Sequence, residues 1–410
     1  MSQNSPMKVS VMTMPKTTTL PRGWKTAKLG TLFTERDEAN CPDLELLSVT
    51  GTRGIIPRSY IEGKDNSNED KGKYLKVCKG DIAYNTMRMW QGVSALSEYS
   101  GIVSPAYTVL KANDNACAEY FQYLFKLQSM IFKFYRWSQG LVDDQRSLKY
   151  HNFSIISVNI PPLPEQRAIG EILTTADKII ATKERHIAAK QHQKRWMMQN
   201  LLTGKMRLPG FSGEWEELSV SKLLTERNTQ APKNENYPLM AFIANVGISP
   251  KGERYDRSAL ILDEENKLYK RTELGDFIYS SNNLESGSIG LNKYGSASIS
   301  PVYSIFKPTK ITVYDYIGRL LTCKGFIGKM VRYRQGVIYG QWRIHEKDFL
   351  RIKVNVPPLT EQTAIAEILT TADREIELLT RELEEQKLIK KYLMQQLLTG
   401  KTRIKGASAV

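Results

Sequence analysis

The chain has 410 residues, of which 41% are hydrophobic and 25% charged, as in an ordinary globular protein of two or three domains. It contains no run of 18 apolar residues, so the sequence predicts no membrane span and a cytoplasmic location. Its four cysteines and four histidines are dispersed without metal-ligand or disulfide spacing, which argues against a metal site. The formal net charge of +15 favours a polyanionic partner, and nucleic acid is the commonest one.

Five segments follow one another along the chain. Residues 1–19 contain no apolar core of signal-peptide length and are expected to form a flexible tail. Residues 20–160 and 206–356 are expected to form two mixed α/β domains. Each domain is followed by a long helix, at 161–205 and at 357–410, and the second helix carries a short tail. The sequence therefore predicts an α+β protein.

In residues 20–160, short runs of β-forming residues lie between turn-forming residues, which predicts strands. These runs are LELLSVT (44–50), GDIAYN (80–85), YTVLK (107–111) and SIISVNI (154–160). Residues 118–137, AEYFQYLFKLQSMIFKFYRW, have apolar side chains at helical spacing and predict a helix.

The first long helix is predicted to open at Pro164 and Glu165, because proline suits the first turn and a carboxylate suits the positive end of the helix dipole. It is expected to end before Gly204, a residue that favours a left-handed cap. A helix of about 38 residues would be roughly 57 Å long. That length exceeds an ordinary globular helix and indicates a coiled coil.

Residues 206–213, MRLPGFSG, contain Gly, Pro and Ser and read as the linker to the second domain. In that domain the predicted strands are PLMAFIANV (238–246), GDFIYSS (275–281), YSIFK (303–307) and FLRIKVNV (349–356).

The second half of the chain repeats the first at an offset of 196 residues. Residues 161–177, PPLPEQRAIGEILTTAD, differ from residues 357–373, PPLTEQTAIAEILTTAD, at three positions. Both helices then end on LLTGK, whereas the domains share only short anchors such as GIVSPAYTVLK (101–111) and ASISPVYSIFK (297–307). An internal pseudo-two-fold duplication is therefore predicted, in which similar helices carry domains with different contact surfaces.

Apolar residues recur at heptad spacing in both helices, so each helix carries a stripe that must be covered. Residues 178–205 contain seven Lys or Arg and one acid, whereas residues 374–401 contain six bases and five acids. This difference favours pairing of the two helices as an antiparallel coiled coil within the chain. The alternative is two separate helices, each packing on its own domain. The expected seam consists of Ile169, Leu173, Ile180, Ile187, Ile365, Leu369, Ile376, Leu379 and Leu383.

Candidate contact residues are basic, aromatic and amide side chains that interleave in turn-like segments. Arg pairs with guanine and Asn or Gln with adenine at base edges, and basic side chains also bind phosphate. In the first domain these residues are Asn85, Arg88, Trp90, Gln91, Arg136, Trp137, Gln139, Gln145 and Arg146. In the second domain they are Asn282, Asn283, Lys329, Arg332, Tyr333, Arg334, Gln335, Gln341 and Arg343. No set of residues with the spacing of a catalytic motif accompanies them.

The doubled helix opening, with its LLTGK ends, resembles the paired conserved regions of the specificity subunit of type I restriction–modification enzymes. GDIAYNTMRMWQG (80–92) and IYSSNNLESGSIGL (278–291) are similar to segments of its target-recognition domains. The resemblance implies that each domain reads one half of a split sequence in double-stranded DNA, and that the helices set the unread spacer.

The resemblance also implies the partners of the chain. The helices would bind two adenine-methylating modification subunits, and motor–nuclease restriction subunits would join that core in a system that defends the cell against phage. S-adenosylmethionine, ATP and Mg²⁺ would belong to those partners, so that this chain binds no cofactor and catalyses no reaction.

Two other functions remain open from the sequence. One is a self-contained DNA methyltransferase or nuclease, which would act without any partner. The other is a coiled-coil scaffold with no role on DNA, whose binding would be indifferent to salt, whereas contacts to phosphate weaken steeply as salt rises.

Overall fold

The computed structural model describes residues 20–50, 53–63, 67–140, 146–244, 246–250, 267–281, 284, 287–338 and 341–404. The chain forms two compact units. Unit 1 combines the described residues up to Glu184 with those from Arg381 onward, and unit 2 is Arg185–Thr380. Each unit therefore contains one globular part and a portion of each long helix. No described helix is both long and apolar enough to cross a lipid bilayer.

The globular part of unit 1 is built on an antiparallel four-stranded sheet in the order β2-β9-β6-β7, beside the two-stranded pairs β1–β10, β3–β4 and β5–β8. Its strands are β1 (Lys25–Lys28), β2 (Phe33–Glu35), β3 (Leu47–Thr50), β4 (Gly54–Pro57), β5 (Leu75–Val77), β6 (Ile82–Asn85), β7 (Ser94–Leu96), β8 (Gly101–Val103), β9 (Tyr107–Ala112) and β10 (Ser157–Ile160). Its short helices are α1 (Leu29–Leu32), η1 (Arg58–Tyr60), η2 (Met89–Gln91), α2 (Ala118–Leu124), α3 (Gln128–Trp137) and α4 (Tyr150–Ser154).

Strand β6 is buried on both faces, which explains its apolar sequence. Ile82 and Tyr84 pack into a large aromatic cluster against the helices, whereas Ala83 packs into a smaller aliphatic cluster. The strand begins after a turn that Asp81 closes, because its carboxylate accepts hydrogen bonds from the backbone N–H of Cys78 and from Arg36, both at 2.8 Å. Side chains that alternate between two cores thus fix the strand in the middle of its sheet.

The segment 118–137, predicted as a helix, forms two helices, α2 and α3. Leu127 adopts an extended conformation between them. The Nζ atom of Lys126 donates hydrogen bonds to the carbonyl groups of Gly92 and Ser94, both at 2.6 Å, and so attaches this break to the chain after η2. The apolar spacing is the same on both sides of the break, so periodicity alone could not reveal it.

Unit 2 repeats this plan, with a four-stranded antiparallel sheet in the order β12-β20-β17-β18. Its other sheets are β13-β16-β19, β11–β23, β14–β15 and β21–β22. Its strands are β11 (Glu216–Ser219), β12 (Leu224–Glu226), β13 (Gln230–Ala231), β14 (Met240–Ile243), β15 (Gly247–Pro250), β16 (Tyr269–Thr272), β17 (Phe277–Tyr279), β18 (Ile289–Leu291), β19 (Ala297–Ile299), β20 (Ser304–Pro308), β21 (Gln335–Ile338), β22 (Gln341–Arg343) and β23 (Lys353–Val356). Its short helices are α6 (Val220–Leu223), α7 (Tyr314–Leu321), α8 (Lys324–Val331) and α9 (Glu346–Arg351). The turn before β17 also repeats, with Asp276 bound to Arg227 at 2.8 Å.

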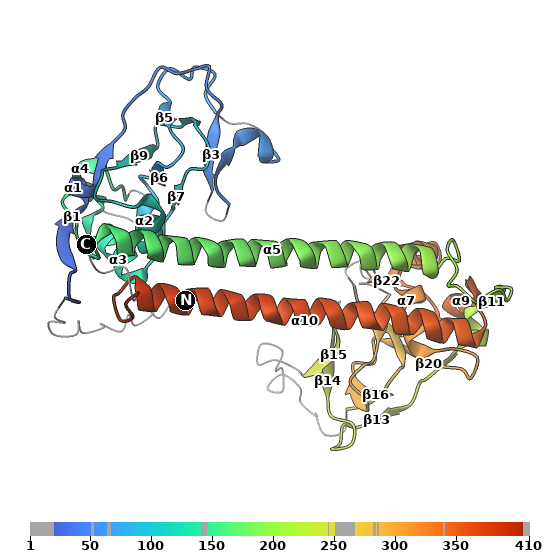
Figure 1. Ribbon diagram of the computed structural model, residues 1–410. Coiled ribbons are helices and arrows are strands. Elements are labelled where there is room, and N and C mark those ends of the chain that lie inside the picture. The colour runs from blue at the N-terminus through green and yellow to red at the C-terminus, as the bar shows by residue number, and fades with distance from the viewer. Residues whose placement is uncertain are drawn as a thin grey trace, which may run out of the picture. The chain divides into compact units, whose positions relative to one another are not determined.

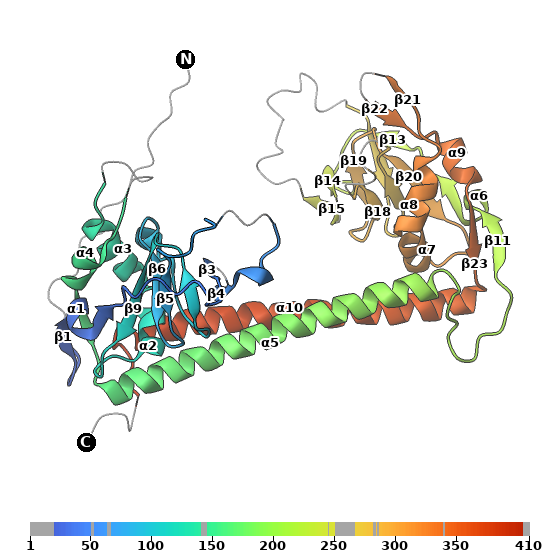
Figure 2. The same cartoon turned by 90° about the horizontal axis from the view of Figure 1, so that it is seen from above.

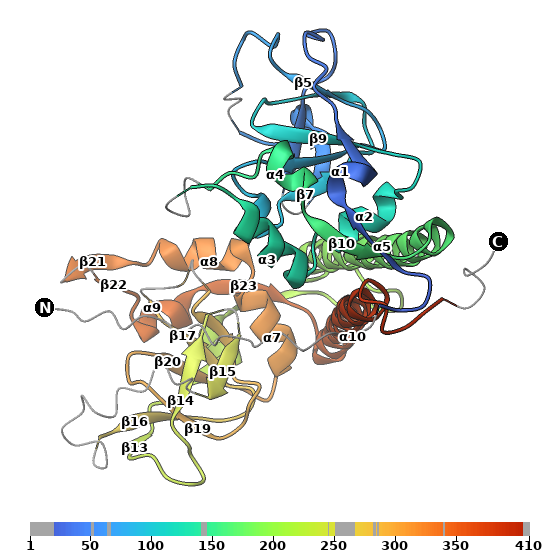
Figure 3. The ribbon, with the colours of Figure 1, turned by 90° about the vertical axis from the view of Figure 1, so that its left-hand side faces the viewer.

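The long helices α5 (Leu163–Leu201) and α10 (Leu359–Leu397) each have 39 residues. Shortly after each helix, Gly204 and Gly400 adopt left-handed φ values of 71° and 70°. A side chain is strained in that conformation, so glycine suits the end of the helix. In unit 1 the start of α5 packs closely on α2. A Cβ atom added at Gly170 would lie only 3.0 Å from the Cβ of Glu119. Helix α2 thus lies between β7 and α5 (Figure 3).

The Glu-Gln pair that opens each long helix attaches the helix to its surroundings. In unit 1, the Gln166 side chain accepts from the backbone N–H of Cys117 and donates to the carbonyl group of Pro161, both at 3.0 Å. Glu165, fully buried, accepts two hydrogen bonds of 2.7 Å from Arg403, which follows α10. In unit 2, Glu361 has the same two bonds from Arg207, which follows α5.

Helices α5 and α10 pair along their length in antiparallel orientation, which confirms the predicted coiled coil (Figures 1 and 2). As residue numbers rise in α5, those of the ion-pair partners in α10 fall, from Asp177–Lys390 at 2.5 Å through Lys183–Glu382 and Lys190–Glu375, both at 2.6 Å, to Lys194–Asp373. Every one of these pairs lies within a single unit.

The expected seam residues differ in their burial. Most of them are buried, namely Ile169, Leu173, Ile187, Ile365, Leu369 and Leu383. Three are partly buried, namely Ile180, Ile376 and Leu379. Ile169 and Leu173 share the unit 1 core with Leu397 and Leu398, at the end of α10. The ends of the helix pair are therefore part of the domain cores as well as of the coiled coil.

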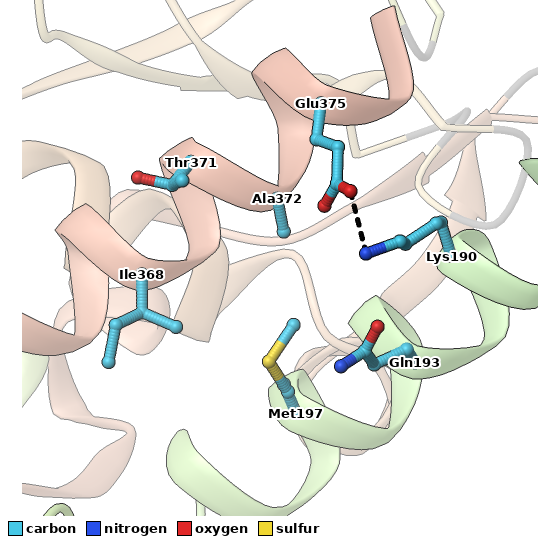
Figure 4. A pocket seen from close by; sticks show the side chains of 7 residues that line it. All are labelled: Lys190, Gln193, Met197, Ile368, Thr371, Ala372 and Glu375. Atoms are coloured by element: carbon cyan, nitrogen blue, oxygen red, sulfur yellow. Dashed lines mark ion pairs between the residues drawn. The ribbon is translucent and has the colours of Figure 1, made fainter. Parts of the chain in front are cut away.

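A shallow groove of about 170 Å³ lies between the helices in unit 2 (Figure 4). Lys190 and Met197 of α5 line one side, and Ile368 and Glu375 of α10 line the other. The Lys190–Glu375 ion pair crosses it. The groove is a polar part of the helix seam and brings together no set of reactive side chains.

Candidate nucleic-acid interface

The structure gathers the candidate contact residues of unit 1 at one place. They lie on the turn after β6, on η2, at the end of α3 and on the chain that leads to α4. Backbone hydrogen bonds hold these pieces together: Gln139 and Ser147 exchange two bonds of 2.9 and 2.8 Å, and the N–H of Leu148 donates to Thr86 at 2.8 Å. Residues separated by about 60 positions in the sequence thus meet beside one end of the sheet.

An aromatic and basic stack forms the centre of this cluster. The Arg146 guanidinium lies 4.0 Å from the ring centre of Tyr135 and donates a hydrogen bond of 2.9 Å to its hydroxyl group. The rings of Trp90 and Tyr135 form an edge-to-face pair, with 6.1 Å between the ring centres. Stacking on an aromatic ring restricts the rotamers of an arginine, so that less entropy is lost when the guanidinium binds a ligand.

The remaining candidates surround this stack or support it. Arg88, Gln91, Arg136, Trp137 and Gln139 are exposed. Asn85 has a structural contact, because its side-chain oxygen accepts a hydrogen bond of 3.0 Å from the N–H of Met87. Gln145 lies outside the described residues.

The second cluster occupies the matching place in unit 2. Arg332, Tyr333 and Arg334 follow α8 and lead directly into β21, and the first two of these side chains are exposed. The β21–β22 pairing sets Gln335 opposite Arg343, whose side chain is also exposed, and Ile338 opposite Gln341.

Two candidates from unit 2 lie outside the described residues, namely Asn282 and Asn283. The preceding residue, Ser281, hydrogen-bonds the backbone of Ile344, next to Arg343. Lys329 has a structural contact, since its Nζ donates to the carbonyl group of Lys353 at 3.0 Å. Lys133 makes the same bond to Ser157 in unit 1. This repetition indicates that both lysines support the domain.

Sequence reasoning missed Tyr135, which lies inside the helix predicted at 118–137. It belongs to the cluster because the chain folds Arg146 back over its ring. A half-exposed aromatic residue near the end of an amphipathic helix is a weak signal, and nothing in the sequence links it to Arg146 eleven positions later. Arg207 and Arg403 were missed as partners of Glu361 and Glu165, although both follow the repeated LLTGK at the same offset.

Among the described residues, no group of three or more His, Cys, Asp or Glu side chains is placed to hold a metal ion. What the described residues of the two clusters offer is guanidinium and aromatic groups on the surface of a basic chain, with the exposed amides of Gln91 and Gln139 in unit 1. Such groups bind phosphate, stack on bases and hydrogen-bond base edges. The fold and the clusters thus define a duplicated recognition protein.

Comparison with known families gives this class a name. Residues 21–190 and 214–388 each match the model of the type I restriction modification DNA specificity domain. The chain belongs to this family and is a specificity subunit of a type I restriction–modification system, the component of such an enzyme that does not catalyse its reactions.

The chain is similar over its length to curated relatives and solved structures. It is 27% identical to a Methanocaldococcus jannaschii protein provisionally assigned as the specificity subunit of the type I restriction enzyme MjaX, over 90% of this chain and 89% of the relative. It is 26% identical to the MjaVIII specificity subunit of the same organism, over 82% and 83% of the two chains.

Two crystal structures share its fold. The HsdS subunit of Thermoanaerobacter tengcongensis has a TM-score of 0.51 at 17% identity, over 94% of this chain and 99% of the other. The S subunit of M. genitalium has a TM-score of 0.56 at 12% identity, over 94% and 98%.

Proposed function

We propose that this specificity subunit recognises a bipartite site in double-stranded DNA. Each globular part reads one half of the site, and the α5–α10 pair sets the length of the unread spacer. The observation that carries the proposal is the contrast between the two repeats. The helix openings differ at only three of the 17 positions in 161–177, whereas the two surface clusters share few residues.

The clusters support the reading of two different half-sites. In both units the chain after a helix folds back on itself, with Gln139 opposite Ser147 in unit 1 and Gln335 opposite Arg343 in unit 2, but the side chains carried there differ. Different side chains in matching places present different patterns of donors and acceptors to base edges. The net charge of +15 supplies the attraction to phosphate that brings both clusters to the duplex.

The surface of the helices supports two equivalent partners. Glu171, Ile172 and Thr175 are exposed on α5, and the identical residues Glu367, Ile368 and Thr371 are exposed on α10. Ile172 and Ile368 thus present the same apolar side chain at matching positions, which two equivalent partners would each bury on binding. The partners we assign to these surfaces are two modification subunits, which bring S-adenosylmethionine, and restriction subunits with ATP and Mg²⁺ join that assembly. A structure of similar fold, with a TM-score of 0.54 and 16% identity, comes from work on complex assembly of a type I system.

Sequencing of methylated bases in cells with and without this chain tests the proposal. The expected result is one adenine-methylated motif that depends on the chain and has two defined halves around a spacer of fixed length. A single uninterrupted motif would contradict the proposal that the two globular parts read separate half-sites. Transfer of labelled methyl groups from S-adenosylmethionine to DNA by the purified chain alone would contradict the need for partners.

Lengthening the helix pair is expected to lengthen the spacer. Seven residues inserted after Glu184 and seven after Thr380 add one heptad to both helices, between the two units, and preserve the seam. The added rise is about 10 Å, equivalent to roughly three base pairs at 3.4 Å each. Selection from DNA libraries with variable spacers should return the same half-site bases with a longer spacer.

The control for this experiment is an insertion in α5 alone, which shifts the helices out of register and should lower thermal stability. If the matched insertion changes the preferred bases and leaves the spacer length unchanged, the helix pair does not set the spacer.

A further inference from the structure

One carboxylate in each repeat joins three helices. In unit 1 it is Asp177, the last residue of the repeated TTAD sequence on α5. One oxygen of Asp177 accepts a hydrogen bond of 2.8 Å from the hydroxyl group of Tyr123, on α2 of the globular part. The other oxygen accepts one of 2.5 Å from Lys390, on α10. Asp177 therefore connects the globular part and both members of the helix pair.

Two further contacts complete this junction in unit 1. The Tyr123 hydroxyl also lies 3.3 Å from the Thr174 hydroxyl, one turn before Asp177. The Lys390 ammonium lies 5.2 Å from the centre of the Tyr123 ring, within the range of a cation–π contact. Burial raises the pKa of Tyr123, so this residue stays a neutral hydrogen-bond donor at physiological pH.

The same junction exists in unit 2, with each group displaced by 196 residues. Asp373 on α10 binds Arg319 of α7 at 2.7 Å and also pairs with Lys194 of α5. Arg319 donates to Thr370 at 3.1 Å, as Tyr123 contacts Thr174. Burial acts to raise the pKa of Asp373, but the hydrogen bonds from Lys194 and Arg319 outweigh it and hold that pKa below its usual value.

Two other ion pairs between α5 and α10 do not repeat in this way. Lys183–Glu382 and Lys190–Glu375 join the two helices at 2.6 Å, but the residues at the matching positions of the other repeat cannot form these pairs. Of the interhelix ion pairs named here, the one that repeats is the one whose carboxylate also binds a side chain of the globular part. The repetition of this junction indicates that it serves the same role for both globular parts.

We propose that Asp177 and Asp373 are positioning residues. Each fixes the orientation of one globular part, the reader of one half-site, on the helix pair, and thereby makes recognition sensitive to spacer length. The inference rests on the proposed reading of a bipartite site. A change of one base pair moves a half-site by 3.4 Å and turns it by about 35° around the duplex, because B-DNA has about 10 base pairs per turn. A reader that binds one oxygen of a carboxylate, while the other oxygen binds the opposite long helix, cannot follow that displacement without breaking a charge-assisted hydrogen bond.

The Asp177→Asn variant tests this role in the full chain. Asparagine keeps the shape and one acceptor oxygen but loses the charge and the second acceptor. Binding is measured to DNA with the native spacer and with spacers one base pair shorter or longer. We expect the affinity ratio between native and altered spacers to fall about tenfold, with the affinity for a fragment holding one half-site unchanged.

Glu382→Gln is the matched control. Glu382 and Asp177 both have side chains that are 43% exposed, and both pair with a lysine across the helix seam of unit 1. The control should lose similar thermal stability yet keep its discrimination between spacers. Tyr123→Phe removes only the hydroxyl group on the side of the reader, and it should reproduce the effect of Asp177→Asn. In unit 2, Asp373→Asn and Glu375→Gln form the corresponding pair.

Unchanged spacer discrimination in Asp177→Asn and Tyr123→Phe, or an equal loss in Glu382→Gln, would overturn the role of the junction. These outcomes differ from failure of the proposed function. That failure would appear in the unaltered chain, as binding that shows no preference for any spacer length.

Discussion

The Arg146→Ala variant is expected to lose recognition of one half of the DNA site and to keep the other. Arg146 is the charged member of the stack with Tyr135 and Trp90, where its guanidinium is held against the Tyr135 ring at 4.0 Å. A guanidinium held in one orientation makes a bidentate contact to a base at low entropic cost. Removal of such a contact costs about 1–3 kcal/mol, which corresponds to roughly 5- to 150-fold in affinity.

The measurement is competition binding with DNA in which one half-site at a time is scrambled. In the unaltered chain, scrambling of either half weakens binding. In Arg146→Ala, scrambling of the half read by unit 1 should have little further effect, and Arg343→Ala should show the same for the other half. An equal loss at both halves in either variant would argue that the arginines bind phosphate without distinguishing sequence.

The second large effect is expected on stability. Arg403→Ala leaves Glu165, which is 0% exposed, without the two 2.7 Å hydrogen bonds that compensate its charge. Loss of one partner of a buried ion pair destabilises by several kcal/mol. Because Arg403 itself is partly exposed, we expect the lower end of that range, about 3 kcal/mol of unfolding free energy.

Urea denaturation followed by tryptophan fluorescence measures this effect, with Lys401→Ala as the control at a nearby exposed position. The double variant Glu165→Gln with Arg403→Ala should recover part of the loss, because a neutral amide is less costly to bury than a carboxylate. If Arg403→Ala is as stable as the control, the contact does not anchor the start of α5.

Much of the fold could be predicted because the pattern of each half recurs in the other half of the sequence. The repeated PPLxEQ opening and LLTGK ending delimit both long helices, and the heptad spacing with unequal charge predicts their pairing. The break between α2 and α3 could not be predicted, because it depends on Lys126 reaching carbonyl groups more than 30 residues away. The Arg403–Glu165 contact joins residues 238 positions apart, and local patterns carry no information on such a pair.

For the candidate site, the sequence indicates the types of residue but not how the fold groups them. Basic and amide residues in turn-like segments are visible in the sequence, and the structure brings those of unit 1 together. Side-chain chemistry alone did not separate Arg146, which stacks on Tyr135, from Lys329, which supports the backbone at Lys353. That distinction depends on the tertiary fold, as does the inclusion of Tyr135.

The pairing of the first and last strands has a consequence for how new specificities arise. In unit 1, β1 and β10 run antiparallel with Lys25 opposite Ile160, and in unit 2, β11 and β23 run antiparallel with Glu216 opposite Val356. The chain enters and leaves each reader at neighbouring points, directly before the repeated helix opening. A reader from another protein can therefore be exchanged as a cassette between these two points, without cutting either helix. One genetic crossover on each side would then replace a whole globular part and leave both long helices intact.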